Sequence, residues 1–379
     1  MRRLVVTGGA GFIGGNFVHY WLDRHPDDRV IVLDALTYAG NVATIAGLEK
    51  TGRMTFVHGD VTDRDLVGKL VAEDGVDTIV HFAAESHVDR SIVEPGAFVR
   101  TNVVGTQVLL DAARAAWSSP SGWRPGARFH HVSTDEVYGS LGPGDPPFTE
   151  KTPYSPNSPY AASKAASDHL VRAYHHTYGL PATISNCSNN YGPYQFPEKL
   201  IPLMIVNALR GLPLPVYGDG RQVRDWLFVE DHCIAIDRIV DADVAGSTFN
   251  VGGRAEHENI EIIQLVCALI DARFGADESL RERFPDCPAS GGRSCVELIS
   301  HVKDRPGHDR RYAIDPTTIA ARLGFEPRHT LNTGLGRTVD WYLENERWWR
   351  GVMDGSYRKW IEGWYGDAAN PDEAQRIKR

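Results

Sequence analysis

Short apolar runs alternate with longer amphipathic stretches along the first half of the chain. Runs rich in β-branched residues predict strands at 3–7, 30–33, 54–57, 78–82, 129–132 and 182–185. Several runs are apolar at almost every position, which is typical of parallel strands buried on both faces. Stretches between them predict helices at 12–22, 63–73, 96–116 and 159–178. This order indicates an α/β fold with a doubly wound parallel sheet.

The pattern changes after about residue 186, where Pro and Gly interrupt the chain, as at 211–215 and 218–220. A helix at 229–241 and a strand at 248–251 are predicted to return to the main sheet. We therefore expect a first domain of residues 1–186, with 226–252 returning to it. Residues 187–225 and 253–366 should form a smaller, discontinuous second domain. Residues 284–294 predict a polar loop, and 367–379 a frayed tail.

Composition and charge exclude several classes of function. Of 379 residues, 42% are hydrophobic and 23% charged, which is typical of a globular protein with a substantial core. The formal net charge is -9 and no basic run occurs, so we expect no nucleic-acid partner. No stretch approaches the roughly 20 apolar residues of a membrane span. The apolar run after Arg3 is too short for a signal peptide, so a cytoplasmic location is expected.

The five cysteines are scattered, odd in number and contain no C-x-x-C pair. Neither a disulfide framework nor a zinc site is therefore expected, and no metal is assigned. Cys287 and Cys295 could pair if oxidised. The alternative is that they are reduced surface thiols, as is usual in a reducing compartment.

A glycine loop follows the first predicted strand and opens the first predicted helix. Gly8 and Gly11 permit a tight turn and a close approach of the backbone to a pyrophosphate, and Gly14 allows the helix to pack on the sheet. The backbone N–H groups of the helix N-terminus, at Phe12 and Ile13, favour an anion. The spacing G-x-x-G-x-x-G is one residue longer than the usual fingerprint. A Rossmann-type dinucleotide site is predicted, and an ordinary strand-to-helix turn is the alternative.

Acidic residues after the second and third strands fit the rest of such a site. Asp34 lies 20 residues beyond Gly14, where a carboxylate would accept from both ribose hydroxyls and repel a 2′-phosphate. This favours NAD over NADP, although Asp34 could instead cap a turn. Asp60 and Val61 are placed to contact the adenine edge, and a helix N-cap at Thr62 or Asp63 is equally compatible with that segment.

Tyr160 and Lys164 are four residues apart on a predicted helix, so both project from one face. A nearby ammonium stabilises a phenolate and lowers the phenol pKa from about 10 toward neutrality. With the hydroxyl of Thr134, this pair could deprotonate an alcohol while a nicotinamide takes the hydride. Thr134 is followed by two adjacent carboxylates, Asp135 and Glu136, which a simple dehydrogenase does not need.

These motifs together resemble the extended short-chain dehydrogenase/reductase family, and within it the nucleotide-sugar 4,6-dehydratases. The resemblance covers nearly the whole chain. Its motifs are the glycine loop, Y-x-x-x-K, the run from Ser133 to Gly139, and the segments 34–41, 83–91, 186–193, 196–202, 224–226 and 304–312.

The resemblance implies a dehydration with NAD as cofactor and dTDP-glucose as the expected substrate. Tyr160, supported by Lys164, takes the proton of the hexose 4-hydroxyl while hydride leaves carbon 4. Glu136 then removes the acidified proton of carbon 5, and Asp135 protonates the departing 6-hydroxyl. Hydride finally returns to carbon 6, giving a 4-keto-6-deoxy sugar. Asp135 must therefore be protonated beside an ionised Glu136, which burial and like charge can arrange.

Binding residues are also implied by the resemblance. The cofactor is expected to contact Gly8, Gly11, Phe12, Ile13, Gly14, Asp34, Thr37, Asp60, Val61, Ala83, Ala84, Ser86, Thr101, Tyr160, Lys164 and Asn190. The nucleotide sugar is expected to contact Ser86, Thr134, Asn189, Lys199, Leu200, Pro215, Val216, Tyr217, Arg224, Asn259, Asp304, Arg305 and His308. The arginines suit a diphosphate, although each could be a surface ion-pair partner. A homodimer through the helices at 96–116 and 159–178 is expected as well.

Two departures limit the transfer of these roles. Residues 142–147 are shorter than the usual loop, and 284–295 look like an insertion before Asp304. Two other functions remain open. A UDP-sugar 4-epimerase or decarboxylase of the same fold has no use for the Asp135–Glu136 pair. A non-catalytic NAD-binding regulator would not need Tyr160.

Overall fold

The computed structural model describes residues 1–73, 75–304 and 309–353. The chain forms two compact units, each assembled from separate segments. Unit 1 comprises Met1–Asn190, Arg224–Glu256 and Asp309–Thr330, and unit 2 comprises Tyr191–Val223, His257–His308 and Leu331–Arg379. No helix in the described part of the chain has both the length and the apolar character needed to cross a membrane.

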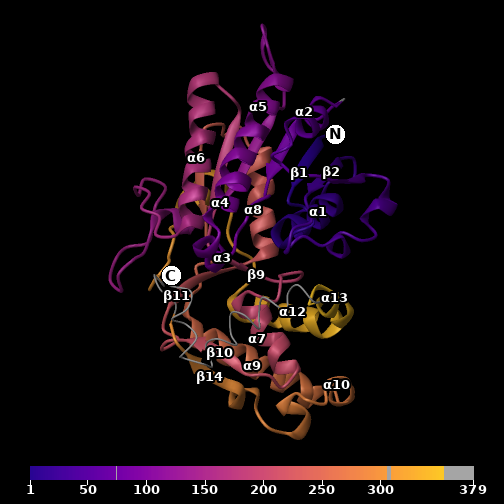
Figure 1. The fold of residues 1–379 in the computed structure, drawn as a ribbon, viewed down its shortest axis with the longest axis vertical. Coiled ribbons are helices and arrows are strands. Elements are labelled where there is room, and N and C mark those ends of the chain that lie inside the picture. The colour runs from indigo at the N-terminus through magenta and orange to yellow at the C-terminus, as the bar shows by residue number, and fades with distance from the viewer. Residues whose placement is uncertain (74, 305–308, 354–379) are drawn as a thin grey trace. The chain divides into compact units, whose positions relative to one another are not determined.

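A seven-stranded sheet in the order β12-β8-β7-β4-β1-β2-β3 forms the centre of unit 1 (Figure 1). Every neighbouring pair is parallel, so the predicted doubly wound fold is confirmed. The predicted strand at 248–251 does join this sheet, beside β8. The strands are β1 (Arg3–Thr7), β2 (Arg29–Asp34), β3 (Met54–His58), β4 (Thr78–His81), β7 (Arg128–Thr134), β8 (Ala182–Cys187) and β12 (Thr248–Val251).

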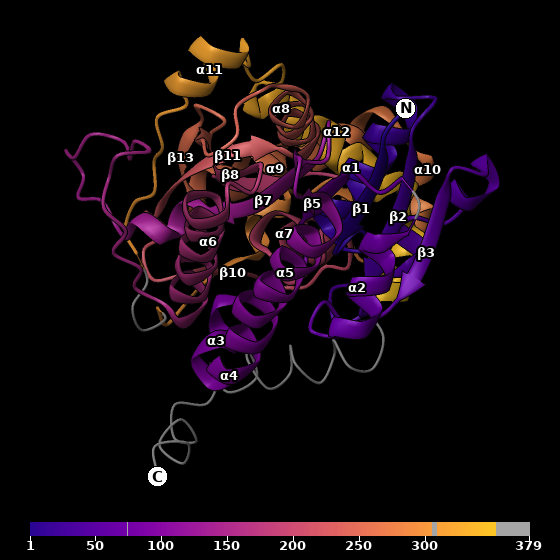
Figure 2. The ribbon, with the colours of Figure 1, turned by 90° about the horizontal axis from the view of Figure 1, so that it is seen from above.

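Helices cover both faces of this sheet, because successive side chains of a strand point to opposite faces. Leu4 and Val6 pack in one core with Phe17 of α1 and Ile236 of α8. Val5 packs in the other core with helices α2, α5 and α6. Figure 2 shows α5 and α6 side by side on their face of the sheet. The helices are α1 (Phe12–Arg24), α2 (Arg64–Ala72), α5 (Gly105–Trp117), α6 (Pro159–Tyr178) and α8 (Val229–Asp241).

The helix predicted at 96–116 is longer and less regular than expected. It begins with α4 (Pro95–Phe98), passes through a π-helix, η3 (Val99–Val104), and continues as α5. A short helix, α3 (Val88–Val93), precedes it. A π-helical turn inside an α-helix is often found at functional sites, and this turn contains Thr101, one of the expected cofactor contacts.

Residues 309–330 differ in position from the domain prediction, which placed them in the second domain. In the structure they belong to unit 1. Tyr312 and Ile314 pack in a core with Tyr138 and Phe148, and Ile319 of α11 (Thr317–Leu323) packs with other unit 1 residues. The sequence did not indicate this because the contacts of Tyr312 and Ile314 join segments more than 150 residues apart.

Unit 2 is mainly helical and contains a two-stranded parallel pair, β10 with β14. Its α7 was not predicted, because residues 201–206 are all buried and the segment therefore lacks the periodicity of an amphipathic helix. Its elements are α7 (Leu200–Leu209), β10 (Leu214–Tyr217), α9 (Asn259–Ala276), α10 (Ser279–Arg283), β14 (Ile299–Val302), α12 (Leu331–Glu344) and α13 (Glu346–Val352).

Short elements complete the described chain. A three-stranded sheet has the order β13-β11-β9, and β5 pairs with β6. The strands are β5 (Ser118–Ser119), β6 (Gly122–Trp123), β9 (Asn189–Tyr191), β11 (Val223–Phe228) and β13 (Glu256–Glu258). The 3-10 helices are η1 (Val42–Thr44), η2 (Leu48–Thr51), η4 (Asp135–Tyr138), η5 (Pro288–Gly291) and η6 (Cys295–Leu298).

The segment predicted as a polar loop at 284–294 is not a simple surface loop. Phe284, Cys287 and Ala289 are buried, and so is Cys295 just beyond it. The alternative that Cys287 and Cys295 are surface thiols is therefore wrong. Their Sγ atoms lie 3.7 Å apart as free thiols. The predicted tail at 367–379 lies outside the described residues.

Candidate active site

The glycine loop connects β1 to α1 as predicted, and its glycines are required by close backbone contacts. Gly8 has a φ of +69°, and a Cβ there would lie 2.7 Å from the amide nitrogen of Ala83. A Cβ on Gly14 would lie 2.3 Å from the carbonyl oxygen of Gly8. Helix α1 starts at Phe12 after the N-cap Gly11, and no side chain caps it. Its first-turn N–H groups therefore suit an anion such as a pyrophosphate.

Asp34 is the last residue of β2 and fixes the glycine loop. Its Oδ2 accepts a hydrogen bond from the amide of Ala10 at 2.9 Å, and its Oδ1 accepts one from Leu36 at 2.8 Å. Burial raises the pKa of Asp34. Each carboxylate oxygen has a second lone pair, so these bonds leave acceptor capacity for a ribose hydroxyl. The predicted contact with the ribose stays a prediction.

Most other expected cofactor residues of unit 1 follow the carboxyl ends of its strands, where ligands of doubly wound sheets bind. Asp60 accepts from the amide of Thr62 at 2.8 Å, so it has a turn-forming role whatever else it contacts. Val61 is buried. Thr37 follows β2, Ala83, Ala84 and Ser86 follow β4, Thr101 lies in η3, and Asn190 lies in β9.

Thr134, Asp135 and Glu136 lie where β7 ends and η4 begins. The hydroxyl oxygen of Thr134 caps η4 by accepting from the amide of Glu136 at 3.3 Å. The Thr134 side chain also lowers the pKa of the Tyr160 phenol on α6, so the two groups lie near each other. The structure therefore brings together the hydroxyl, the two carboxylates and the tyrosine that were predicted to act together.

Asp135 is placed to be a neutral acid. Only 2% of its surface is exposed, and its Oδ2 has no hydrogen-bond partner among the described residues. Burial raises its pKa well above the ordinary value, and the charges of Glu136 and Asp225 raise it further. A buried carboxyl next to a second carboxylate is the arrangement that separates a proton donor from a proton acceptor. Glu136 is half-buried.

The pKa of Tyr160 is not lowered toward neutrality in this structure, contrary to expectation. Burial raises the pKa of Tyr160 well above 10, and the charge of Glu136 raises it further. The Lys164 ammonium instead donates to the carbonyl oxygen of Val132 at 2.8 Å and lies 3.3 Å from His131 Nε2. Burial lowers the pKa of Lys164 to about 8. The two side chains do share one buried face of α6, as their spacing predicted.

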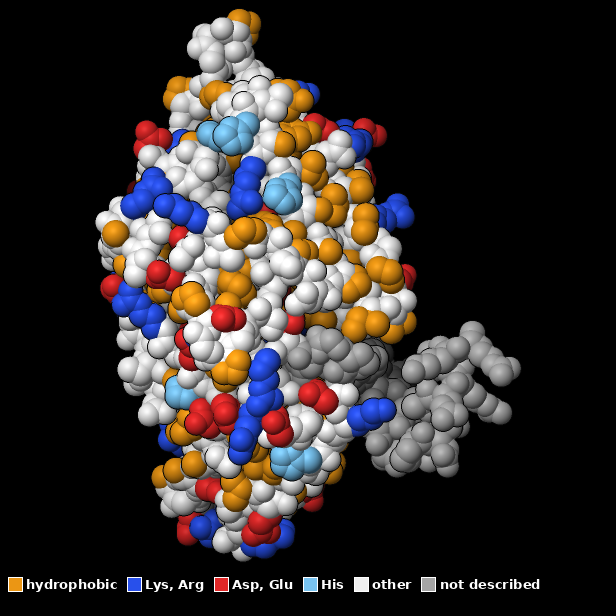
Figure 3. Space-filling view, turned by 90° about the vertical axis from the view of Figure 1, so that its left-hand side faces the viewer, with side chains coloured by type: hydrophobic (Ala, Val, Ile, Leu, Met, Phe, Trp, Pro, Cys, Tyr) orange, Lys and Arg blue, Asp and Glu red, His pale blue; other side chains and the backbone are white. Residues whose placement is uncertain are grey.

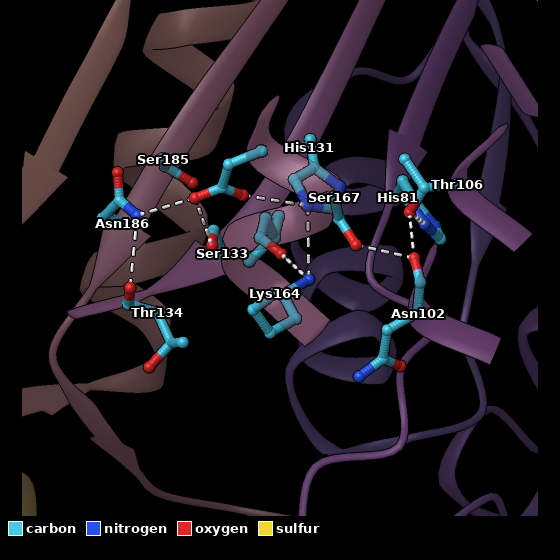
Figure 4. Close-up of polar contacts among 12 residues, drawn as sticks. His81, Asn102, Thr106, His131, Ser133, Thr134, Lys164, Ser167, Ser185 and Asn186 are labelled. Atoms are coloured by element: carbon cyan, nitrogen blue, oxygen red, sulfur yellow. Dashed lines mark hydrogen bonds and ion pairs between the residues drawn. The ribbon is translucent and has the colours of Figure 1, made fainter. Parts of the chain in front are cut away.

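The sequence analysis missed a polar network that joins Lys164 to His131 and Asp168 (Figure 4). His131 and Asp168 are both fully buried, and His131 Nε2 lies 3.3 Å from Asp168 Oδ1. Two patterns in the sequence could have revealed them. Asp168 follows Lys164 by four residues, which repeats the Tyr160–Lys164 spacing on the same helix face. His131 alternates with Phe129 and Ser133 along β7, so all three share one side of the strand.

The expected substrate residues of unit 2 gather around the turn at 218–222. Gln222 donates to Asp304 Oδ2 at 3.0 Å, and its carbonyl oxygen accepts from the amide of Asn259 at 3.0 Å. A Cβ on Gly220 would lie 2.7 Å from Val216. Pro215 and Tyr217 flank Val216 in β10, while Lys199 and Leu200 begin α7, which packs against β10. Arg305 and His308 lie outside the described residues.

Four of the expected substrate residues belong to unit 1, namely Ser86, Thr134, Asn189 and Arg224. Arg224 is buried, stacks on the ring of Tyr312 with its guanidinium 4.4 Å from the ring centroid, and donates to the carbonyl oxygen of Asp309 at 2.9 Å. Its charge lowers the pKa of Asp135, so it acts on the acid. Asn189 lies in β9, with Oδ1 buried and without a hydrogen-bond partner among the described residues.

The model of the GDP-mannose 4,6-dehydratase family matches residues 5–338 of this chain. The chain belongs to this family. A dTDP-glucose 4,6-dehydratase of Xanthomonas campestris pv. campestris (strain B100) is 57% identical over 94% of this chain and 98% of its own length. Another from Neisseria meningitidis serogroup B is 53% identical over the same shares. The match to this 4,6-dehydratase family therefore includes segments of both units of the chain.

A solved structure shares the fold of this family member. The dTDP-glucose 4,6-dehydratase of Streptomyces venezuelae, solved with NAD bound, is 47% identical and has a TM-score of 0.80. The match covers 92% of this chain and 99% of that one. The predicted membership of a 4,6-dehydratase group is confirmed.

Proposed function

We propose that this protein dehydrates dTDP-glucose to dTDP-4-keto-6-deoxyglucose. The observation that carries the proposal is the pair Asp135 and Glu136 at the end of β7, beside the phenol of Tyr160. A redox enzyme that only oxidises an alcohol has no need for two adjacent carboxylates. The names of the relatives, 57% and 53% identical, support the same reaction and the same nucleotide.

The cofactor is NAD, and unit 1 fits it. The cradle at Gly8 and Gly14 admits no side chain, and the uncapped start of α1 offers amides to a pyrophosphate. Asp34 disfavours a 2′-phosphate by its charge and its closeness to the loop. When bound, NAD supplies a hydride acceptor for carbon 4 and a hydride donor for carbon 6.

The side chains supply the proton transfers. Tyr160 takes the proton of the 4-hydroxyl in its phenolate form, beside the Thr134 hydroxyl, and the Lys164 ammonium stabilises that phenolate. Glu136 removes the proton of carbon 5, which the neighbouring ketone has made acidic. Asp135, held neutral by burial, protonates the leaving 6-hydroxyl so that it departs as water. Glu136 then returns its proton to carbon 5, and transfer of the proton held by Tyr160 to Asp135 restores both residues for the next cycle.

We assign the cofactor to unit 1 and the nucleotide moiety of the sugar to unit 2. The assignment to unit 2 is supported by the grouping of Val216, Asn259 and Asp304 around one turn. The remaining expected contacts to the sugar or its diphosphate are Ser86, Thr134, Asn189, Lys199, Leu200, Pro215, Tyr217 and Arg224, together with Arg305 and His308, which lie outside the described residues.

Turnover of the purified protein on dTDP-glucose tests the proposal. The product should have lost one water and should carry a carbonyl at carbon 4, without any added reductant. UDP-, CDP- and GDP-glucose are assayed in parallel, and dTDP-glucose should give the highest kcat/KM. An epimerised product of unchanged mass, or no product with NAD bound, would refute it.

A homodimer is also proposed, through α4, η3, α5 and α6. Apolar side chains gather on part of the surface of unit 1 (Figure 3). Ile92, Val93, Val99 and Val104 are exposed large hydrophobic residues on α3 and η3, and Tyr178 is one at the end of α6. Such a patch on a monomer is typical of an interaction surface. Analytical ultracentrifugation should show a dimer for the native protein and a monomer for Val99→Asp, and a native monomer would contradict the proposal.

We further propose a cytoplasmic location, since all five cysteines are free, as is usual in a reducing compartment. Fractionation of the source cells would check it, because recovery of the protein in a non-cytoplasmic fraction would contradict it.

A further inference from the structure

Lys164 is a buried cation with few polar groups near its ammonium. Its side chain is only 3% exposed, and its ammonium donates to the carbonyl oxygen of Val132. The second group near it is the ring of His131, with Nε2 at 3.3 Å. A buried ammonium needs a counter-charge, because removal from water strongly disfavours the charged form.

The counter-charge lies on the far side of His131. Asp168 Oδ1 is 3.3 Å from the same Nε2 atom that Lys164 contacts, and both side chains are fully buried. A ring nitrogen offers either one N–H or one lone pair. His131 Nε2 can therefore accept from Lys164 or donate to Asp168, but it cannot do both at once. In either arrangement the positive charge of Lys164 and the carboxylate of Asp168 lie on either side of the same ring nitrogen.

Asp168 is held as an anion by several donors. Its Oδ2 accepts hydrogen bonds from Ser133 at 2.9 Å, from Tyr154 at 2.8 Å and from Asn186 at 3.3 Å. Burial by itself raises the pKa of Asp168, but the hydrogen bond and charge of His131, the charge of Lys164 and the hydroxyl of Tyr154 together lower it. The carboxylate therefore stays charged although its side chain is fully buried.

Four elements present titratable groups to Lys164. These are Asp168 on α6, His131 on β7, His81 on β4 and Cys187 on β8. Burial lowers the pKa of His81 well below its usual value and that of His131 to about 4, so both rings are neutral near pH 7. Burial raises the pKa of the Cys187 thiol to about 12. Of these four groups, Asp168 is the one that carries a charge at neutral pH.

We propose that Asp168, acting through His131, is a positioning residue that keeps Lys164 in its ammonium form during turnover. The proposal rests on the role proposed above for Lys164 beside Tyr160. Among the described residues, neither Asp168 nor His131 forms a hydrogen bond or ion pair with Tyr160, so both act through Lys164. The three residues Tyr160, Lys164 and Asp168 then form one functional row along the buried face of α6.

A purely structural role for Asp168 makes a different prediction. Its bonds to Ser133 and Asn186 tie α6 to β7 and β8, and losing them would lower stability or reduce kcat equally at every pH. Loss of a counter-charge instead lowers the pH at which Lys164 loses its proton. The alkaline limb of the kcat profile reports such a group in the substrate complex.

The test compares Asp168→Asn with two controls. Asp168→Glu keeps the charge, and Ser133→Ala removes one donor to the carboxylate without removing the charge. In Asp168→Asn, the alkaline limb should move down by about one pH unit, which is a loss of kcat of about fivefold at the pH of the wild-type midpoint. KM should stay within about twofold, and both controls should keep the wild-type limb.

The titration of Lys164 is also read directly, by NMR of protein labelled with carbon-13 in lysine. Its signal is assigned as the one missing from Lys164→Met. The lysine should titrate at a lower pH in Asp168→Asn than in the wild type. If Asp168→Asn does not fold, His131→Leu is used, which removes the acceptor for the ammonium and should lower the titration in the same direction.

The outcomes separate this proposal from the one on which it rests. An unchanged Lys164 titration in Asp168→Asn, or in His131→Leu, overturns the role of Asp168. Full turnover by Lys164→Met would instead overturn the role of Lys164 in the reaction, whatever the NMR titration shows.

Discussion

Replacement of Lys164 by Met should abolish turnover and stabilise the protein. The side chain is buried, and its pKa falls from 10.5 to about 8, mainly through burial and despite the charge of Asp168. That fall corresponds to about 3 kcal/mol of unfavourable free energy for holding the ammonium in the folded state. Loss of the hydrogen bond to Val132 offsets about 1 kcal/mol. Met fills nearly the same volume, so a net gain of about 2 kcal/mol is expected at pH 7.

The gain should depend on pH in a defined way. Below about pH 8 the lysine is charged in both the folded and the unfolded state, so the folded state carries the full cost. Between pH 8 and 10.5 the unfolded state binds more protons, and the stability of the wild-type protein rises relative to Lys164→Met. The advantage of the variant should therefore be largest at pH 7 and should have disappeared at the alkaline end of this range.

Urea unfolding, followed by tryptophan fluorescence at pH 7 and at pH 10, measures this difference. Each variant is unfolded with and without added NAD, because cofactor bound to the folded state alone also shifts stability. Lys151→Met is the matched control, since Lys151 is exposed and should change stability by no more than about 0.5 kcal/mol. A Lys164→Met protein that is less stable than the wild type at pH 7, or a gain that does not change with pH, would refute the reasoning.

Three further predictions concern other parts of the chain. Glu136→Gln should lower the rate of water loss by at least about a hundredfold but leave oxidation at carbon 4 possible; reduced nicotinamide should then accumulate in a stopped-flow absorbance trace, and a normal product rate would contradict this. Gly14→Ala should weaken NAD binding, measured by calorimetry, because its Cβ would lie 2.3 Å from the carbonyl oxygen of Gly8; wild-type affinity would show that the loop can move. Treatment with oxidised glutathione should link Cys287 to Cys295, with loss of two hydrogens in the mass spectrum and none in Cys287→Ser; two unmodified thiols after treatment would count against the pairing.

Local patterns predicted most of the first unit. The strand at 3–7 and the helices at 159–178 and 229–241 have the bounds that the sequence indicated. Such elements bury one face or both faces, so the periodicity of their apolar residues records their structure directly. Helix α7, in contrast, was missed. Almost every position of this segment is apolar and buried, so its sequence shows no helical periodicity.

The glycine loop, the Asp135–Glu136 pair and the Tyr160–Lys164 spacing are properties of the sequence by itself. Each depends on residues that are neighbours along one loop or one helix, where chain geometry fixes the spacing. The glycine loop with Asp34 indicated the cofactor class, and the resemblance carried by these motifs implied the type of reaction. The fold was predicted separately, from the alternation of apolar runs and amphipathic stretches.

Only the tertiary structure decided how the site is charged. The pKa of Tyr160 is raised instead of lowered, and Lys164 bonds to Val132 and His131. The pairing of His131 with Asp168 also emerges only when β7 packs against α6. The physical reason is that burial and charge act through space. The pKa of a buried group depends on the elements packed around it, and residues distant along the chain supply those neighbours.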